Sequence, residues 1–570
     1  MKRHSIFLTI SILSAIFFCS CEFLDGLFGL EEDATIHEVY SYETSVSLKE
    51  LPKGSTVYLA KINPSNRDIS DSNTRRVESF TGDARSIVPA TSSEITKFNT
   101  TESFTDANTW EYKIHNYPRF ENAQIVKKTP SARSAARTAG FPAYQIGTPK
   151  ELNIETSSGS YTGRTAYLRA AGTYCYVWVV DGYFTSNASG NKIDAKIAQN
   201  FANKFDEMYP LITNIYGNES DYLYEISYDE KGNQIISLED IEENSDTGNM
   251  INIVICDIPG DTILGEFSSK DYYFSFDELT GNDAAINYSN WGKYFYIDAY
   301  SAVNKYNESI STLAHEFQHM ISFYQKNTRF YEQENNTANP IDTNLDEMLS
   351  MLCEDMMQSY LRISDKESPK GRLQWFNAAY YKSGIRQFNN TDQDSRSASY
   401  SNAYAFGAWL CREYGGASLV QRIMRNNYTD NKAITMATNI DMDTLILQFM
   451  QAITGSERYT LNKAASKLVS YKNYNYPMNA IDLFSDTKIN NKYLYAINGS
   501  SIFRSNESSF YSEYNGFGPM LFNKNTALEL KQMYGFSIHG IAKITEDDGK
   551  ITVNFGGNGS KDLKMYLIVQ

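Results

Sequence analysis

The chain has 570 residues, which is enough for three or four domains. Its net charge of −16, with 68 acidic against 52 basic residues, argues against nucleic acid as a partner. Apart from a short stretch near Lys127–Arg137, the sequence has no basic cluster that would bind a polyanion.

Residues 1–20 predict an export signal rather than a folded element. A basic start precedes the apolar run Ile6–Phe18, which is short for a transmembrane helix. The small residue before Cys21 resembles the bacterial lipobox, so we expect Cys21 to be lipidated, with a tether over residues 21–35. This predicts a lipid-anchored protein of the bacterial cell envelope, on the outer membrane, facing the periplasm or the surface. A secreted protein whose signal is cleaved nearby is the alternative.

Residues 36–126 predict an N-terminal β-sandwich domain. Thr44–Leu48 and Thr56–Ile62 alternate apolar and polar residues between turns rich in proline, glycine and asparagine. Residues 127–149 are rich in Ser, Ala, Arg, Thr and Pro, and predict an exposed linker that could also be a processing site. Whether the N-terminal domain is an inhibitory pro-segment or a permanent spacer stays open.

Residues 150–480 predict an α+β domain, which makes the chain a multidomain α+β protein. We expect strands within Leu152–Val180 and at Ile251–Asp257, with a helix near Ile193–Ile215 between them. Helices should dominate from Leu345 to about Ser470.

The segment Ser311–Tyr324 contains the pattern His-Glu-x-x-His and predicts a helix. His315 and His319 are four residues apart, so they share one helix face and could bind one metal ion. Glu316 lies about 100° round the helix from His315, within reach of water on that metal. Two imidazoles and a carboxylate base predict a hydrolytic zinc centre.

A third ligand is expected from the helix predicted over Asn344–Asp355. The run Asp346–Ser350 resembles the Asn-Glu-x-x-Ser/Ala run that carries the glutamate ligand in gluzincin metallopeptidases, with Asp346 in place of the usual Asn. The resemblance implies Glu347 as the ligand. Glu354 lies on nearly the same face and is the rival, although we expect it to orient a ligand histidine instead.

These pieces, in this order, resemble the hyicolysin-type family of bacterial zinc metallopeptidases. The resemblance is carried by Thr312–Ile321, the helix around Glu347, Ser289–Asp298 and Tyr404–Gly416, and it covers roughly Ala166–Asn427. It implies a zincin-like core of mixed sheet and active-site helix, followed by a helical subdomain. It also implies one catalytic Zn²⁺ and protein or peptide substrates.

The expected chemistry needs a base and an oxyanion donor. Zinc lowers the pKa of its bound water, and Glu316 would take that proton and return it to the leaving amine. None of the other four histidines lies in the peptidase region. We therefore expect Tyr404 to be the oxyanion donor, with Tyr400 as the alternative, because both begin the helix that the resemblance places behind the site.

Residues 483–570 predict a separate C-terminal β-domain, with strands at Ile551–Phe555 and Lys564–Val569. Four cysteines predict buried free thiols, because each lies in an apolar segment far from the others: Cys175, Cys256, Cys353 and Cys411.

The sequence thus predicts a zinc-dependent endopeptidase held by lipid on the bacterial envelope. One alternative is a surface-binding, adhesin-like lipoprotein that uses a zincin scaffold with little or no catalysis. Another is a zinc hydrolase of a non-peptide substrate. Cleavage specificity and oligomeric state are not predicted by any pattern in the chain.

Overall fold

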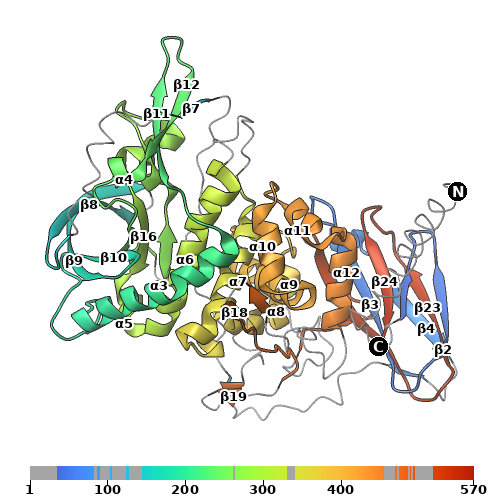
Figure 1. Ribbon diagram of the computed structural model, residues 1–570. Helices are drawn as coiled ribbons and strands as arrows, with labels where there is room; N and C mark the ends of the chain where they lie inside the picture. The colour runs from blue at the N-terminus through green and yellow to red at the C-terminus, as the bar shows by residue number, and fades with distance from the viewer. Residues whose placement is uncertain are drawn as a thin grey trace, which may run out of the picture.

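A computed structural model shows a mixed α+β protein with several sheets and helices, as the sequence predicted at this level (Figure 1). The expected export signal, Cys21, and most of both the tether and the linker lie outside the residues that the structure describes. Those residues are 35–82, 87–89, 103–104, 123–127, 144–157, 159–260, 263–329, 340–454, 469–471, 474–485, 488–489, 492–493 and 518–570.

The half of the chain for which the sequence predicts a peptidase, here residues 144–454 and called the peptidase half, is built on a six-stranded sheet with the order β14-β16-β13-β10-β9-β8. Its central strands β10, β13 and β16 are parallel, and their apolar runs are buried on both faces, as is typical of parallel sheets. The edge strand β14 is antiparallel to β16. The strands are β8 (Pro149–Ser157), β9 (Ser160–Ala171), β10 (Cys175–Val180), β13 (Ile251–Cys256), β14 (Gly265–Phe267) and β16 (Lys293–Asp298).

A second, four-stranded sheet has the order β15-β11-β12-β7 and rises beside the first (Figure 1). It corrects a predicted boundary, because β7 comes from residues assigned to the N-terminal domain yet pairs with β12 of the peptidase half. The strands are β7 (Gln124–Lys127), β11 (Tyr222–Tyr228), β12 (Gln234–Asp240) and β15 (Tyr273–Phe274).

Helices fill the centre of the molecule. The predicted helix near Ile193–Ile215 is α3 (Ala195–Tyr216), whose start is capped by the Asp194 side chain on the Ile197 N–H. The helix with the two histidines is α6 (Tyr306–Ser322). Among the described residues the following α-helices come next: α7 (Thr343–Leu361), α8 (Leu373–Ala379), α9 (Gln393–Tyr414), α10 (Ala417–Arg425), α11 (Asn431–Thr438) and α12 (Met442–Ile453).

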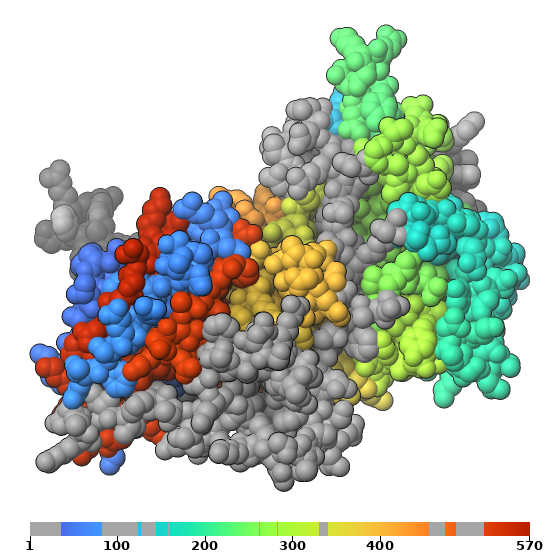
Figure 2. Space-filling view, turned by 180° about the vertical axis from the view of Figure 1, so that it is seen from behind, coloured from blue at the N-terminus to red at the C-terminus, as the bar shows by residue number. Residues whose placement is uncertain are grey.

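The prediction of separate N-terminal and C-terminal β-domains is wrong, because strands from both chain ends form one β-domain. One sheet has the order β1-β24-β3-β22-β21, with β5 on β22, and the other has the order β2-β23-β4. Blue and red segments accordingly alternate over this lobe in Figure 2. The strands are β1 (Thr35–Glu38), β2 (Ser45–Leu51), β3 (Thr56–Asn63), β4 (Arg76–Gly82), β5 (Ile87–Pro89), β21 (Phe522–Asn523), β22 (Gly535–Ile544), β23 (Gly549–Gly556) and β24 (Lys564–Val569).

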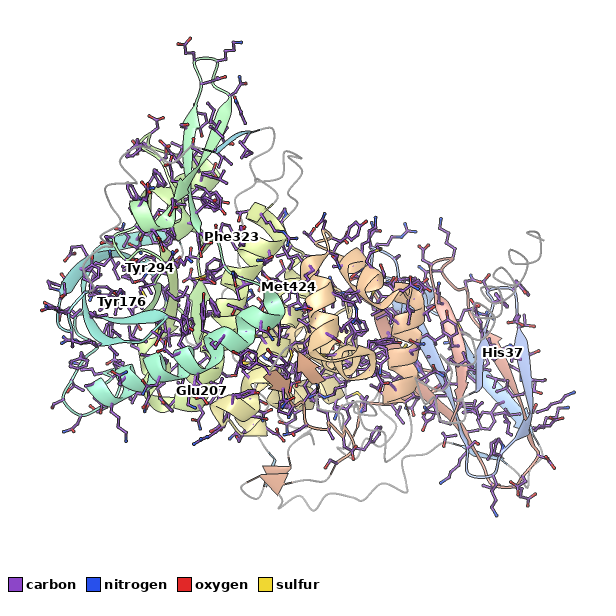
Figure 3. The ribbon with its side chains drawn as sticks, in the orientation of Figure 1. His37, Tyr176, Glu207, Tyr294, Phe323 and Met424 are labelled. Carbon is purple, nitrogen blue, oxygen red and sulfur yellow. The ribbon has the colours of Figure 1, made fainter. Side chains whose placement is uncertain are left out.

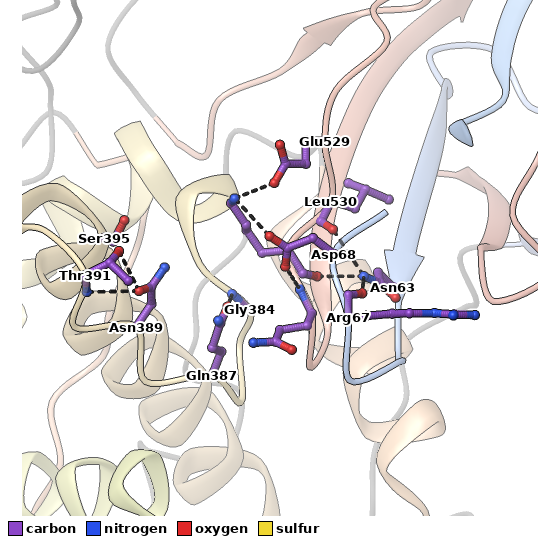
Figure 4. A network of polar contacts seen from close by, with 12 residues as sticks. Asn63, Arg67, Asp68, Gly384, Gln387, Asn389, Thr391, Ser395, Glu529 and Leu530 are labelled. Carbon is purple, nitrogen blue, oxygen red and sulfur yellow. Dashed lines mark hydrogen bonds and ion pairs between the residues drawn. The ribbon is translucent and has the colours of Figure 1, made fainter. Parts of the chain in front are cut away.

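The loops of this β-domain join the two chain ends as well. The Asn63 side chain donates hydrogen bonds to the Leu530 carbonyl at 3.1 Å and to the Arg67 carbonyl at 2.8 Å. Asp68 accepts from Lys531 at 3.1 Å, in the network that Figure 4 shows. N-terminal and C-terminal segments are therefore tied together at the loops as well as in the sheets.

The larger β-sheet also packs on the helices. Side chains on one face of β3, such as Leu59, fill the β-domain's own core, while those on the other face, such as Ile62, join the core of the helical region. Tyr380 stacks on Phe536 with ring centroids 4.5 Å apart. The β-domain is thus docked on the helices rather than held at the end of a linker.

Two further features concern the thiols and the apolar character of the helices. The four cysteines that follow Cys21 are free and buried, which confirms the prediction of buried free thiols. Within the described residues, no helix combines the length and the apolar character needed to cross a bilayer.

Candidate metal centre

Helix α6 carries the His-Glu-x-x-His pattern through the middle of the peptidase half. His315, Glu316 and His319 are all fully buried. The helix ends at Ser322 and continues as a π-helical turn from Phe323, which is labelled in Figure 3, to Asn327. Within this turn the buried Lys326 ammonium donates to three backbone carbonyls at the end of α10 and just beyond it, so the end of α6 is fixed.

Helix α7 packs along α6 and brings Glu347 to the two histidines. Glu347 Oε2 lies 3.2 Å from His315 Nε2 and 3.8 Å from His319 Nε2. One ligand atom from each of the three residues lies within 4.8 Å of the others. The structure therefore brings together the residues that the sequence proposed as metal ligands.

The second nitrogen of each histidine contacts a carboxylate from α7. His315 Nδ1 lies 2.8 Å from Glu354 Oε1, and the Ser311 hydroxyl donates to the other Glu354 oxygen at 2.5 Å. His319 Nδ1 lies 3.0 Å from Asp346 Oδ2. Glu354 therefore occupies an orienting position, as expected. The contact between Asp346 and His319 was not predicted from the sequence. The signal that could have revealed it was the presence of Asp346 in place of the usual Asn.

The donor set fits a divalent cation. Apart from its approach to the two histidine rings, the buried Glu347 Oε2 has no hydrogen-bond partner among the described residues. Burial raises the pKa of Glu347 to about 7, while His319 opposes that shift. Burial lowers the pKa of His319, but Asp346 and the neighbouring glutamates outweigh it and raise that pKa to about 9. A buried cluster this rich in carboxylates favours a cation, and two imidazoles with one carboxylate are a donor set that zinc prefers.

Glu316 lies on the same helix next to the edge strand β14. A Cβ atom at Gly265 would lie 2.5 Å from Thr312 Cγ2 and 3.0 Å from Glu316 Oε1, so a larger residue there would displace the Thr312 side chain. Burial raises the pKa of the Glu316 carboxyl well above its usual range; His319 opposes this shift and Glu347 adds to it. A carboxyl with that environment can hold or release a proton near neutral pH once a nearby cation changes the balance.

The structure does not support the expected role of Tyr404 as oxyanion donor, because its hydroxyl is engaged by a carboxylate that belongs to a buried ion pair. The Tyr404 hydroxyl is buried and donates to Asp355 Oδ2 at 3.0 Å, where Asp355 also pairs with Arg412. Tyr400, the alternative, is also buried, with the Arg372 guanidinium 4.6 Å from its ring centroid. Helical spacing placed both tyrosines on one helix but did not reveal which neighbours their hydroxyls meet.

The chain is similar to a known protease. It is 24% identical to the neutral metalloprotease ShpI of Staphylococcus hyicus over 347 residues, which is 58% of this chain and 68% of the relative. No protein-family model matches the chain. The distant relative and the His-His-Glu cluster support a metallopeptidase, and hence a metal-binding hydrolase, at the general level.

Proposed function

We propose that this protein is a zinc-dependent endopeptidase with a zincin-like core, whose metal ligands are His315, His319 and Glu347. The observation that carries the proposal is the convergence of these three side chains around one point, with Glu316 on the same helix. When bound there, zinc would polarise the scissile carbonyl and supply the positive charge that stabilises the oxyanion.

The remaining steps belong to this chain's own residues. The Glu316 carboxylate accepts a proton from the attacking water and delivers it to the leaving amine nitrogen. Glu354 and Asp346 hold the two histidine rings through their Nδ1 atoms. The buried surroundings of the cluster limit access of bulk water, which strengthens each of these electrostatic interactions.

A polypeptide substrate is supported by strand β14. In the order of described strands β14 ends its sheet, and the edge of a sheet is where an extended peptide can add a strand. Gly265 of this strand lies against Glu316, so a peptide added there would pass close to the base. An ester or other small substrate would not need such an edge.

Zinc analysis and casein cleavage test the proposal together. We expect about one zinc per chain and cleavage that stops with a chelator and returns with zinc. Glu316→Gln should keep zinc and lose activity by about 10²- to 10⁴-fold, because the amide cannot take a proton. His315→Ala should lose most of the zinc. Glu207→Gln, on the exposed side of α3, is the matched control and should behave as wild type.

Each other outcome has a defined meaning. Wild-type zinc content in His315→Ala would place the site elsewhere. Zinc binding with no cleavage by the wild type would favour the adhesin-like alternative. Cleavage of esters but not of casein would favour a non-peptide substrate.

We also propose that a lipid on Cys21 anchors the protein to the bacterial cell envelope. The support is the sequence before that cysteine. Cys21→Ser should leave the signal uncleaved or release the chain from the membrane. The released chain would then be missing from the detergent phase in which a lipid-anchored protein is found. Normal membrane retention of this variant would point instead to a protein partner.

A further inference from the structure

We propose that Glu266 of β14 and the pocket that it lines form a substrate subsite, which selects a lysine side chain in the polypeptide that is cleaved. The inference rests on the proposed endopeptidase activity and on peptide pairing at the edge strand β14. It adds a substrate class that neither of them specifies. Glu266 is separate from the metal ligands, the base and the carboxylates that contact the histidines.

The three residues of β14 divide between the two faces of the sheet. Gly265 lies against Glu316 of α6, and Phe267 belongs to the apolar core that includes the buried face of α6. Glu266 lies between them and pairs with Tyr296 of β16, which belongs to the core on the opposite face. The Glu266 side chain is therefore on the face away from the metal cluster.

Glu266 lines an open pocket on that face. The sheet curves so that its other edge strand, β8, approaches β16 (Figure 1): the Asn153 N–H of β8 donates to Asn290 at 2.9 Å, and Asn290 donates to the Tyr296 hydroxyl at 2.8 Å. The pocket is lined from both edges of the sheet, and its free interior holds about one water-sized group. It can therefore take the tip of a side chain that enters at the edge.

An extended peptide on β14 would direct side chains into this pocket. Along a strand, successive side chains point to opposite faces of the sheet. Substrate side chains on the face of Gly265 would point toward Glu316 and the metal cluster, and those that alternate with them would point toward Glu266. The subsite thus needs only the strand pairing that the proposed function already contains.

The charge of the pocket favours a cation. The described residues that line it include three carboxylates, from Glu155, Asp257 and Glu266, and the ammonium of Lys270. The Lys270 ammonium lies 2.5 Å from Asp271 Oδ1, so a carboxylate outside the pocket lining already balances its charge. Glu155 and Glu266 are buried, which strengthens their interaction with a positive group beside them.

The aromatic walls of the pocket suit an ammonium group. Lys270 shows this within the chain, because its Nζ lies 5.3 Å from the Tyr161 ring centroid and 5.7 Å from that of Tyr296. Both rings line the pocket, and the face of an aromatic ring attracts a cation. An ammonium is a compact charge, whereas a guanidinium is a wider planar fork, so the small interior favours lysine over arginine.

Two matched sets of peptides test the proposal. Fluorogenic peptides of otherwise neutral sequence carry lysine at one position at a time, or norleucine, its uncharged counterpart, at the same position. At one position the wild type should cleave the lysine peptide with a kcat/KM about 10- to 100-fold above that of the norleucine peptide, as expected for a hydrogen bond to a charged group. Mass spectrometry of the products would check that both peptides are cut at the same bond.

The ratio of the two kcat/KM values is the readout for the variants. Glu266→Gln keeps the shape of the side chain and removes its charge, so the ratio should fall to about threefold or less. Glu266→Asp keeps the charge and should retain a higher ratio than Glu266→Gln. Glu278→Gln, at an exposed carboxylate outside the pocket, is the matched control and should keep the wild-type ratio.

A ratio is needed because Glu266 also acts on the base. Its charge contributes to the raised pKa of Glu316, so its removal can change the cleavage of both peptides. That change, like any general loss of folded enzyme, affects both peptides equally and cancels in the ratio.

The outcomes distinguish this inference from the proposed function. If the wild type cleaves no peptide of either set, the endopeptidase proposal fails and the subsite fails with it. If cleavage depends on zinc but lysine and norleucine peptides are cut equally at every position, the endopeptidase stands and the subsite is overturned. A lysine preference that Glu266→Gln retains in full would also overturn the role of Glu266.

Discussion

The peptidase half and the β-domain are assembled from the chain in opposite ways. The metal cluster comes from α6 and α7, which follow one another in sequence. The β-domain comes from both ends of the chain, since β3 lies between β22 and β24. Spacing along the sequence therefore predicts the metal cluster, whereas the β-domain depends on pairings between distant strands that no local pattern contains. If this difference matters, changes to the β-domain should affect folding of both chain ends, and changes near α6 and α7 should have local effects.

The largest effect should come from removing the N-terminal strands. A chain starting near Ala143 lacks β1–β5 and β7, so β22 and β24 lose the strand between them and expose their apolar faces. We expect an insoluble product, or one whose residues 518–570 are rapidly digested by protease. Soluble fraction and mass spectrometry of the digest would measure this.

The matched control is a chain starting at Thr35, which keeps every described strand and should stay soluble. A soluble, zinc-binding product that starts near Ala143 would show that the peptidase half folds alone. Higher activity of that product would show that the N-terminal segment inhibits the enzyme, which its place in the centre of a sheet argues against.

The next effect lies inside the peptidase half, at a buried ion pair between α7 and α9. Arg412 holds Asp355 with two hydrogen bonds of 2.8 and 3.1 Å, and neither side chain is exposed. Asp355→Leu should lower the free energy of unfolding by about 3–5 kcal/mol, because it leaves a buried guanidinium unpaired. Urea titration would measure it.

The double variant Asp355→Leu/Arg412→Met is the control for this pair. It removes both charges, so we expect it to recover much of the lost stability. An equal loss in the single and double variants would mean that packing, not the unpaired charge, sets the cost.

Tyr404→Phe should have a smaller effect, on stability rather than on activity. It removes one hydrogen bond to Asp355, which Arg412 continues to hold, so the loss should be about 1–2 kcal/mol. We expect kcat/KM for peptide cleavage to stay within about threefold of wild type, since the hydroxyl donates to the Asp355 carboxylate of a buried ion pair. A hundredfold loss of kcat/KM with unchanged stability would restore Tyr404 as the oxyanion donor.

Tyr404 illustrates what the sequence could and could not predict. Local spacing predicted α6, α7 and the meeting of His315, His319 and Glu347, because these depend on helical periodicity and one helix pair. It predicted the helix that carries Tyr404 but not the tertiary packing that turns its hydroxyl toward Asp355. The contact of Asp346 with His319 was hidden for the same reason.

The β-domain shows the corresponding limit for strands. Strand-like runs predicted β2, β3, β23 and β24, although among these only β2 and β23 show the alternating burial of a half-buried strand. The pattern does not specify a partner, so two domains were predicted where the strands form one. The burial of polar residues in the β-domain, such as His539, could not be predicted either. His539 is buried because β22 pairs with β3 and β21, and β3 comes from a distant part of the chain.

His539 should make the β-domain mildly sensitive to acid. The imidazole is fully buried in β22, where Nδ1 donates to the Asn523 carbonyl at 2.8 Å and Nε2 accepts from Ser537 at 2.9 Å. Burial, with Lys61 adding to it, lowers the pKa of His539 well below its usual range. The folded state thus favours the neutral ring.

Stability from this residue should be complete above the unfolded pKa of about 6.5 and should be lost as pH falls below it, because the unfolded state then binds a proton that the folded state refuses. Between pH 6.5 and 5.5 the expected loss is about 1 kcal/mol. Urea titrations of wild type and His539→Gln at both pH values would isolate this contribution from that of the carboxylates, which is common to both chains. The variant should be less stable at pH 7 yet show a shallower decline. If both chains decline equally, His539 already binds its proton in the folded state, and the β-domain core admits a charge that its burial argues against.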